Sequence, residues 1–593
     1  MTTYQILQNV NWNSLPIDDY RQSFFIKIYC EKLNLTNPFF IQARLGTIFS
    51  CIEEIKLYIN SLDYSKNSAY IQNGIEELIE LIDDDKVFLK LIKDNWTFFK
   101  EKLQVIIKEG IGKQKINLIN ILNILISYKL NYEENLYEEM SFSIFGECDL
   151  KEKDRVLTAI EENTSRYISY LLDSGFSHLY LFNRKEYFTR SSNYGGRSFK
   201  VQFDSIFYKL SKSRQEFKVY FLISNISGFE QFKEYFVDNN INILENIENK
   251  VSKSYYDKLK KTNIDDKFLE LSLESSDYMV ASSNARKILD KLLDIALYSS
   301  KCNFKVSDTC IVKSMKEPCA THDVSILEMS EKTYRELSLY SHRYQVAQFN
   351  HTIQKLEDLD KSQMLQSLRY VRLTRNIISN EQKILNLWIS FESLFSWKGD
   401  ASVLGILSEY VPKLYAQVAF LSRLDLALQI VKKCKIKIIE SKANKNLTIN
   451  ELFNIFADES LAIKIFKNIE DDLLQYRWKK LYDAYNSDKH IIKQLKKTEK
   501  DVSRQIRRIY FLRNKISHTG FYSDINPILT LHLMDYVQVC YVALNKGLLE
   551  CTQIEDRLFS FEEIFSYLLL KTDLLFYRNG NDVKINYENL FLL

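Results

Sequence analysis

The fold of the C-terminal half is decided by one predicted helix within residues 501–520, which read DVSRQIRRIYFLRNKISHTG. At roughly 100° per residue, Val502, Ile506, Ile509 and Ile516 fall within about 80° of one another and predict a core-facing stripe. Arg513 falls inside this stripe. An unpaired buried guanidinium costs several kcal/mol, so we expect Arg513 to have a carboxylate partner or an aqueous cleft.

His518 and Asn514 complete a candidate catalytic set with Arg513. Gly520 is placed to stop the helix near Ser517, which would free His518 to turn back toward the cleft that Arg513 faces. Histidine suits proton transfer near neutral pH, and arginine holds a phosphate through two N–H groups. Since an R-x4-H spacing also arises by chance, the prediction of phosphodiester cleavage needs a second feature.

That second feature is a charge on an apolar helix surface. The predicted helix 381–397 carries Glu392 among Leu385, Trp388, Ile389 and Phe395. We expect Glu392 to pair with Arg513 across the bundle, where it would orient the arginine or tune the histidine. A structural ion pair that fixes helix register is the equal alternative.

The opposite side of the 501–517 helix carries Arg504, Arg507, Arg508 and Lys515, together with Phe511. These four basic residues are the predicted RNA-binding set, since cations on one helix face can contact successive phosphates. A solvated face with no ligand is the simpler alternative for such a row.

The whole chain is predicted to be mainly α. We expect an all-helical N-terminal domain over residues 1–140 and a small α+β domain over 141–330 that acts as a sensor or regulator. A helical bundle follows over 331–560, with a C-terminal tail over 561–593 that packs on it. Strands are expected at 199–203, 217–223, 278–282, 304–307 and 309–314, where β-branched and aromatic residues cluster.

Composition places the chain among soluble proteins of about three to four domains. The 593 residues carry a net charge of +3, so nucleic-acid binding would need local patches. The N-terminus lacks a secretory signal and no apolar run of about 18 residues occurs, so we expect a cytoplasmic protein that contacts no membrane. Cys302, Cys310, Cys319 and His322 cluster without a C-x2-C pair, which favours thiols over a zinc site.

Three segments together resemble the Apea-like HEPN domain: residues 385–395 (LNLWISFESLF), 410–414 (YVPKL) and 512–520 (LRNKISHTG). The upstream segments 171–181 and 215–221 also look like regions that precede this domain in large bacterial proteins. The resemblance implies a helical domain that forms a homodimer or higher oligomer, with two R-x4-6-H motifs facing one composite cleft. It also implies RNA cleavage without a metal, in antiviral or toxin systems.

The function expected from residues and resemblance is a metal-independent HEPN endoribonuclease of antiphage, abortive-infection defence. The ribose 2′-OH would attack its own 3′-phosphate to leave a 2′,3′-cyclic phosphate and a 5′-OH end. His518 would act as base or acid, Arg513 would stabilise the phosphate charge, and Asn514 would position the backbone or the loop. No cofactor is needed. RNA, with tRNA a candidate, is the expected substrate, and a phage-derived trigger is a candidate partner. The alternative is a non-catalytic HEPN module that serves as sensor, scaffold or oligomerisation platform.

Overall fold

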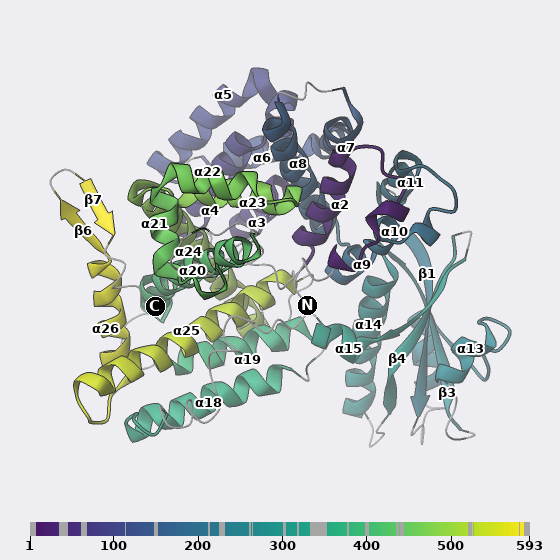
Figure 1. Ribbon diagram of the computed structural model, residues 1–593. Coiled ribbons are helices and arrows are strands. Elements are labelled where there is room, and N and C mark those ends of the chain that lie inside the picture. The colour runs from purple at the N-terminus through teal and green to yellow at the C-terminus, as the bar shows by residue number, and fades with distance from the viewer. Residues whose placement is uncertain are drawn as a thin grey trace.

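A group of N-terminal helices, an antiparallel sheet and a C-terminal helical bundle follow one another along the chain (Figure 1). The computed structural model describes residues 7–34, 46–60, 68–112, 114–147, 152–211, 214–224, 232–259, 263, 265–299, 304–316, 319–332, 353–375, 377, 379–395, 397, 403–434, 438, 444–519, 525, 527–579 and 582–585. The protein is mainly helical, as its sequence predicts.

The N-terminal helices share one core that reaches from Leu7 to Leu210. The elements are η1 (Trp12–Ser14), α2 (Tyr20–Lys32), α3 (Ile48–Ile59), α4 (Ser68–Asp84), α5 (Lys86–Glu109), α6 (Lys115–Ser127), α7 (Lys129–Phe145), α8 (Lys153–Asp173), α9 (His178–Asn183), α10 (Glu186–Thr189), η3 (Ser191–Asn193) and α11 (Phe199–Ser211). This core continues past residue 140, where the sequence placed a boundary. It also takes in Leu473, Tyr476 and Phe511 of the C-terminal half.

The stretch 199–203, predicted as a strand, belongs to helix α11, so that prediction is wrong. Phe199, Phe203 and Phe207 recur at a spacing of four and therefore lie on one face of the helix. All three pack against the ring of Phe25, with centroid distances of 6.3, 5.2 and 6.1 Å. This aromatic packing in the N-terminal core overrides the strand-like alternation of the sequence.

The middle of the chain forms a five-stranded antiparallel sheet in the order β2-β3-β1-β4-β5. Its elements are β1 (Gln215–Ser224), α12 (Lys233–Asp238), β2 (Ile241–Leu244), α13 (Lys253–Tyr256), η5 (Asp257–Leu259), β3 (Lys267–Ser275), α14 (Tyr278–Ser299), β4 (Lys305–Ser314), β5 (Thr321–Ser325) and α15 (Ile326–Lys332). The predicted strand at 217–223 is confirmed as part of β1, and the two strands predicted at 304–307 and 309–314 are one continuous strand, β4. The first turn of α14 replaces the strand predicted at 278–282.

Asp277 explains why that segment is helical. Its buried carboxylate accepts the backbone N–H groups of Met279 at 2.8 Å and Val280 at 3.0 Å, which caps the N-terminus of α14. The other carboxylate oxygen accepts the backbone N–H of Ser177 at 2.7 Å, so Asp277 also ties the sheet to the helix α9.

The C-terminal half is a helical bundle followed by a hairpin. Its elements are α18 (Asp358–Thr374), α19 (Asn380–Ser393), α20 (Val403–Lys433), η7 (Asn444–Asn446), α21 (Ile449–Ala457), α22 (Glu459–Lys467), α23 (Asp472–Tyr485), α24 (Asp488–Thr519), α25 (Pro527–Ile554), α26 (Phe561–Leu574), β6 (Phe576–Asn579) and β7 (Asp582–Ile585). Residues 333–352, at the start of the predicted bundle, lie outside the described residues.

Helix α20 is the central helix of this half and passes from one core cluster of the bundle to the next. It is long and apolar enough to cross a membrane, but 89% of its most apolar window is buried inside the protein. Such burial is what the core helix of a soluble protein shows. Helix α26 contributes Phe561, Phe565 and Leu568 to the same core as α19 and α24.

Candidate active site

Arg513 of α24 and Glu392 of α19 meet where the two helices cross, beside the ring contact between Trp388 and Tyr510. The Nη2 group of Arg513 donates to both carboxylate oxygens of Glu392, at 3.2 and 3.3 Å. The indole N–H of Trp388 donates to Glu392 at 2.6 Å and fixes its carboxylate from the same helix. The predicted contact across the bundle is confirmed.

Burial of the neighbouring residues shows why Arg513 needs this partner. Val502, Ile506, Ile509 and Ile516 are all buried in the bundle core, as the helical wheel predicts. Arg513 lies at the border of that core, with 27% of its side chain exposed. Its guanidinium therefore has a paired side and a side that water or a phosphate can reach.

Asn514 contacts the arginine itself. Its Oδ1 accepts a hydrogen bond from Nη1 of Arg513 at 3.0 Å. Arg513 is thus held from two sides, by an amide oxygen and by a carboxylate. The sequence analysis expected Asn514 to position the backbone or a loop, so the contact with the arginine is an addition.

His518 does not turn back toward Arg513 within this chain. Helix α24 runs to Thr519, two residues beyond the predicted end, and His518 is an exposed residue of its last turn. On a continuous helix, five positions correspond to a separation of about 140° around the axis. Gly520, the expected stop signal, lies outside the described residues.

The predicted RNA-binding face of α24 is covered by the N-terminal helices. Arg504, only 6% exposed, donates to Glu80 of α4 at 2.7 and 3.1 Å. Arg508 donates to Glu54 of α3 through two bonds of 2.7 Å and to Glu77 of α4 at 3.1 Å. The expectation that these two arginines lie on a solvated face is wrong, because that face docks on another part of the chain.

Aromatic packing closes the same face. Phe511 is 8% exposed, and its ring lies 4.6 Å from that of Tyr58 and 5.8 Å from that of Tyr70. Of the four predicted RNA-binding residues, Arg507 and Lys515 keep partial exposure. A helical wheel shows which residues share a face but not what covers it, which is why the sequence missed this contact.

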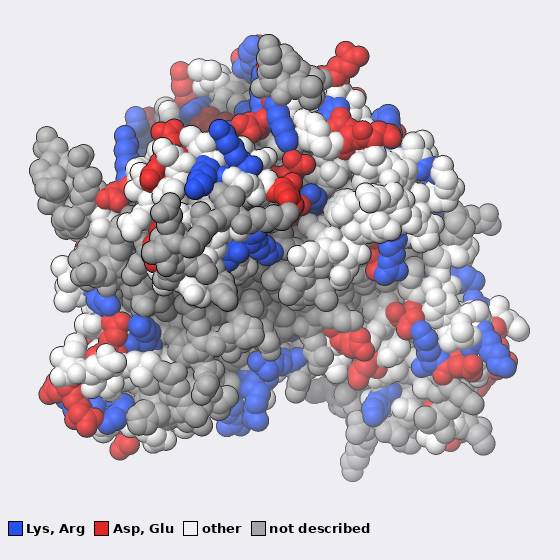
Figure 2. All heavy atoms as spheres, viewed as in Figure 1, with Lys and Arg blue, Asp and Glu red and all other residues white. Residues whose placement is uncertain are grey.

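A basic row that the sequence analysis did not select lies on α18. Arg369, Arg372 and Arg375 recur every three residues at its C-terminal end and are all exposed. Figure 2 shows basic side chains gathered over that end of the helix. Within the described parts of the chain, these three arginines have no carboxylate partner. The regular spacing of these three arginines is the signal by which the sequence could have revealed them.

The cysteine cluster gives no metal site among the residues that are described. Cys310 is buried in β4, and burial raises its pKa to about 12, whereas Cys319 is exposed. His322 stacks on Tyr278 with ring centroids 3.9 Å apart. Cys302 lies outside the described residues.

Comparison with known proteins adds nothing to this geometry: no family model, no curated protein and no solved structure matches the chain.

Proposed function

We propose that the protein is a metal-independent endoribonuclease of the HEPN type whose site contains Arg513, Asn514 and His518. The observation that carries the proposal is the partly exposed Arg513 held by Glu392 and Asn514, because a guanidinium fixed in this way can bind a phosphate with little reorganisation. The resemblance of residues 385–395 and 512–520 to the Apea-like HEPN domain supports it.

In the proposed reaction the ribose 2′-OH attacks the adjacent phosphorus, and the bond from phosphorus to the 5′-oxygen breaks. The proton of the 2′-OH goes to a base, the 5′-oxygen receives a proton from an acid, and a 2′,3′-cyclic phosphate and a 5′-OH remain. Arg513 stabilises charge on the phosphate oxygens and His518 transfers protons. Since His518 and Arg513 point apart on the same helix, we further propose a homodimer in which each arginine works with the partner copy's histidine.

The experiment is cleavage of labelled RNA by the purified protein in excess EDTA. We expect Arg513→Ala and His518→Ala to lose activity by about a hundredfold or more, as removal of a general acid or base does. His490→Ala is the matched control, because His490 is an exposed histidine at the other end of α24 that contacts only Asn486 among the described residues. Cleavage that requires a divalent metal, or that survives both substitutions, contradicts the mechanism.

Glu392→Gln distinguishes an orienting role from a structural one. Glutamine keeps the oxygen that accepts from Trp388 but removes the charge that attracts Arg513. If Glu392 orients Arg513, kcat falls while the melting temperature stays within about 2 °C of the wild type. A lower melting temperature with unchanged kcat shows that the pair only fixes helix register.

The second candidate is a non-catalytic RNA-binding or oligomerisation module. It is favoured by the orientation of His518 and by the engagement of Arg513 with Glu392. This candidate predicts RNA binding without cleavage products, and expression that is equally tolerated with and without His518→Ala. A defence role and a phage-derived trigger belong to the first proposal alone and are tested by survival of infected cells that express His518→Ala.

A further inference from the structure

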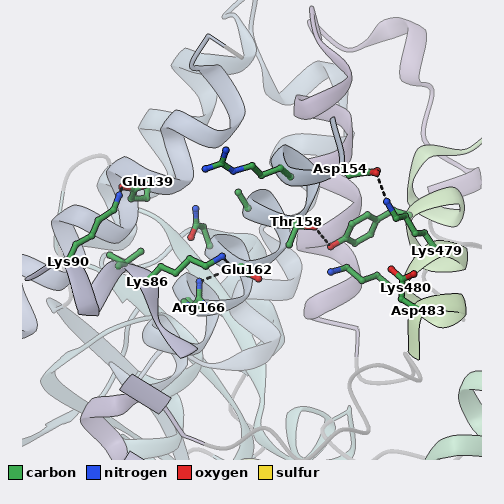
Figure 3. A pocket seen from close by; sticks show the side chains of 15 residues that line it. Lys86, Lys90, Glu139, Asp154, Thr158, Glu162, Arg166, Lys479, Lys480 and Asp483 are labelled. Atoms are coloured by element: carbon green, nitrogen blue, oxygen red, sulfur yellow. Dashed lines mark hydrogen bonds and ion pairs between the residues drawn. The ribbon is translucent and has the colours of Figure 1, made fainter. Parts of the chain in front are cut away.

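A pocket of about 530 Å³ lies between the N-terminal helices and α23 (Figure 3). Its walls come from α5, α7 and α8 on one side and from α23 on the other. The pocket is separate from the Arg513 site. Its volume falls within the roughly 300–1,000 Å³ of ordinary small-molecule sites, which also favour the junctions between parts of a protein.

Cationic side chains outnumber carboxylates around the pocket. The basic residues are Lys86, Lys90, Arg155, Arg166, Lys479 and Lys480, and the acidic ones are Glu139, Asp154, Glu162 and Asp483. The lining therefore carries six positive and four negative charges, and two carboxylates just outside it, Glu152 and Asp85, pair with Arg155 and Arg166. An anion would therefore be attracted by the individual cations that these carboxylates do not pair, and not by a net charge of the pocket.

Several of these charged residues form ion pairs with one another within the lining. Lys90 pairs with Glu139, and Lys479 pairs with Asp154. Glu162 lies 3.6 Å from the ammonium of Lys86 and 3.5 Å from the guanidinium of Arg166, which also pairs with Asp85 at 3.7 Å.

Lys480 is the most available cation of the α23 wall. Within the described residues it has no carboxylate partner, and its ammonium lies 5.3 Å from the centre of the Tyr476 ring. Asp483, one turn further along α23, likewise has no cation partner among the residues described.

Figure 3 shows the side chains of Lys86 and Lys480 pointing toward each other from opposite walls. Two ammonium groups that face the same cavity repel, and an anion between them removes the repulsion. The hydroxyl of Thr158 and the buried amide of Asn163 lie in the same lining and supply further hydrogen-bonding groups.

The wall that carries Lys480 is firmly anchored. Arg477, next to Tyr476 on α23, forms a buried ion pair with Glu31 of α2 at 2.7 Å, with 3% and 0% of the two side chains exposed. Arg477 also pairs with Glu161 of α8 at 2.7 Å, and Tyr476 donates to that carboxylate at the same distance. A fixed wall lowers the entropy lost when a ligand binds.

We propose that this pocket binds a small anion with two or more phosphate groups, held between Lys86 and Lys480. A lysine ammonium is a compact point charge that binds phosphate well, and the pocket has room for a molecule the size of a nucleotide. A bound anion bridges α5 and α8 to α23 and so strengthens the docking of the N-terminal helices. Helix α24, which carries Arg513 near its far end, begins three residues after α23 ends.

The test is isothermal titration of the full chain with pyrophosphate, with ATP and with adenosine, at constant ionic strength and without divalent metal. We expect saturable binding of pyrophosphate or ATP and none of adenosine. Pyrophosphate binding equal to that of ATP identifies the phosphates as the recognised group, and tighter ATP binding adds a contribution from the nucleoside. Failure of both phosphate probes to bind more tightly than about 1 mM overturns the proposal.

Two double variants locate the site. Lys86→Ala with Lys480→Ala removes the facing ammonium groups, and we expect affinity to fall at least about tenfold. Lys93→Ala with Lys467→Ala removes two exposed lysines of α5 and α22 outside the pocket and should leave affinity unchanged. Equal losses in the two variants mean that only net charge matters, which overturns the site. Neither outcome depends on the ribonuclease proposal, because binding is read without RNA.

Discussion

Replacing Arg508 by methionine should loosen α24 far more than replacing an ordinary surface arginine. Arg508, with 13% of its side chain exposed, joins Glu54 and Glu77, which are 19% and 3% exposed. Its loss leaves two carboxylates facing each other without a cation in a largely dry interface. Breaking one partner of a buried pair costs about 3–5 kcal/mol, and the partial exposure of Glu54 places our expectation near the lower figure, about 3 kcal/mol.

The measurement is hydrogen exchange of the α24 backbone amides, which gives the free energy of local opening of this helix. A global free energy of unfolding is less suitable, because a chain of this length need not unfold in one step. Arg155→Met is the control, since Arg155 is 81% exposed and pairs with Glu152 on its own helix. That change should alter the opening free energy by under about 0.5 kcal/mol. A double-mutant cycle with Glu77→Gln should return a coupling energy of about 1–3 kcal/mol.

Two results would refute the reasoning. One is an Arg508→Met effect no larger than that of Arg155→Met, which would mean that the interface is hydrated. The other is a coupling energy near zero with Glu77→Gln, which would mean that the loss comes from packing of the arginine stem and not from its charge.

Three further predictions concern pH, RNA and packing. Burial and neighbouring carboxylates raise the pKa of Asp501 to about 6, so the stability it contributes is present below its unfolded pKa of 3.8 and is lost as pH rises through about 6. Asp501→Asn should therefore reduce the fall of the melting temperature between pH 4 and 8 and stabilise the protein at pH 7.5. An unchanged dependence of the melting temperature on pH contradicts this prediction. Arg369→Glu with Arg372→Glu should weaken RNA binding by the His518→Ala protein and lower the slope of its salt dependence by roughly one and a half units, because two phosphate contacts are lost. An unchanged salt dependence means that RNA does not contact α18. Gly547→Ala places a methyl group 2.8 Å from Ile564, so we expect about 1–3 kcal/mol less stability in urea titration, and no loss would mean that α26 shifts freely.

The sequence predicted best where one pattern controls one contact. The isoleucine stripe of α24 and the charge of Glu392 on an apolar surface were both visible as positions on a wheel, and the helices that carry them meet as expected. The helical wheel was sufficient here because a charged side chain among core residues needs a partner of opposite charge or access to water.

The sequence predicted worst where a residue depends on a distant part of the chain. Arg504 and Arg508 are residues of a type usually exposed to water, and they become interior residues because α3 and α4 dock on them. Phe199 and Phe203 alternate as in a strand, yet the ring of Phe25 gathers them on one side of a helix. Both errors arise because tertiary packing decides between local structures of similar propensity.

The shared helix has a consequence for any attempt to study the bundle by itself. Helix α24 has its isoleucines in one core, whereas Phe511 belongs to the core of the first 210 residues. A fragment that begins after the sheet would expose that aromatic ring and leave Arg504 and Arg508 without the carboxylates of α3 and α4. Such a fragment should aggregate or bind polyanions indiscriminately, so its behaviour toward RNA would describe the cut surface and not the protein.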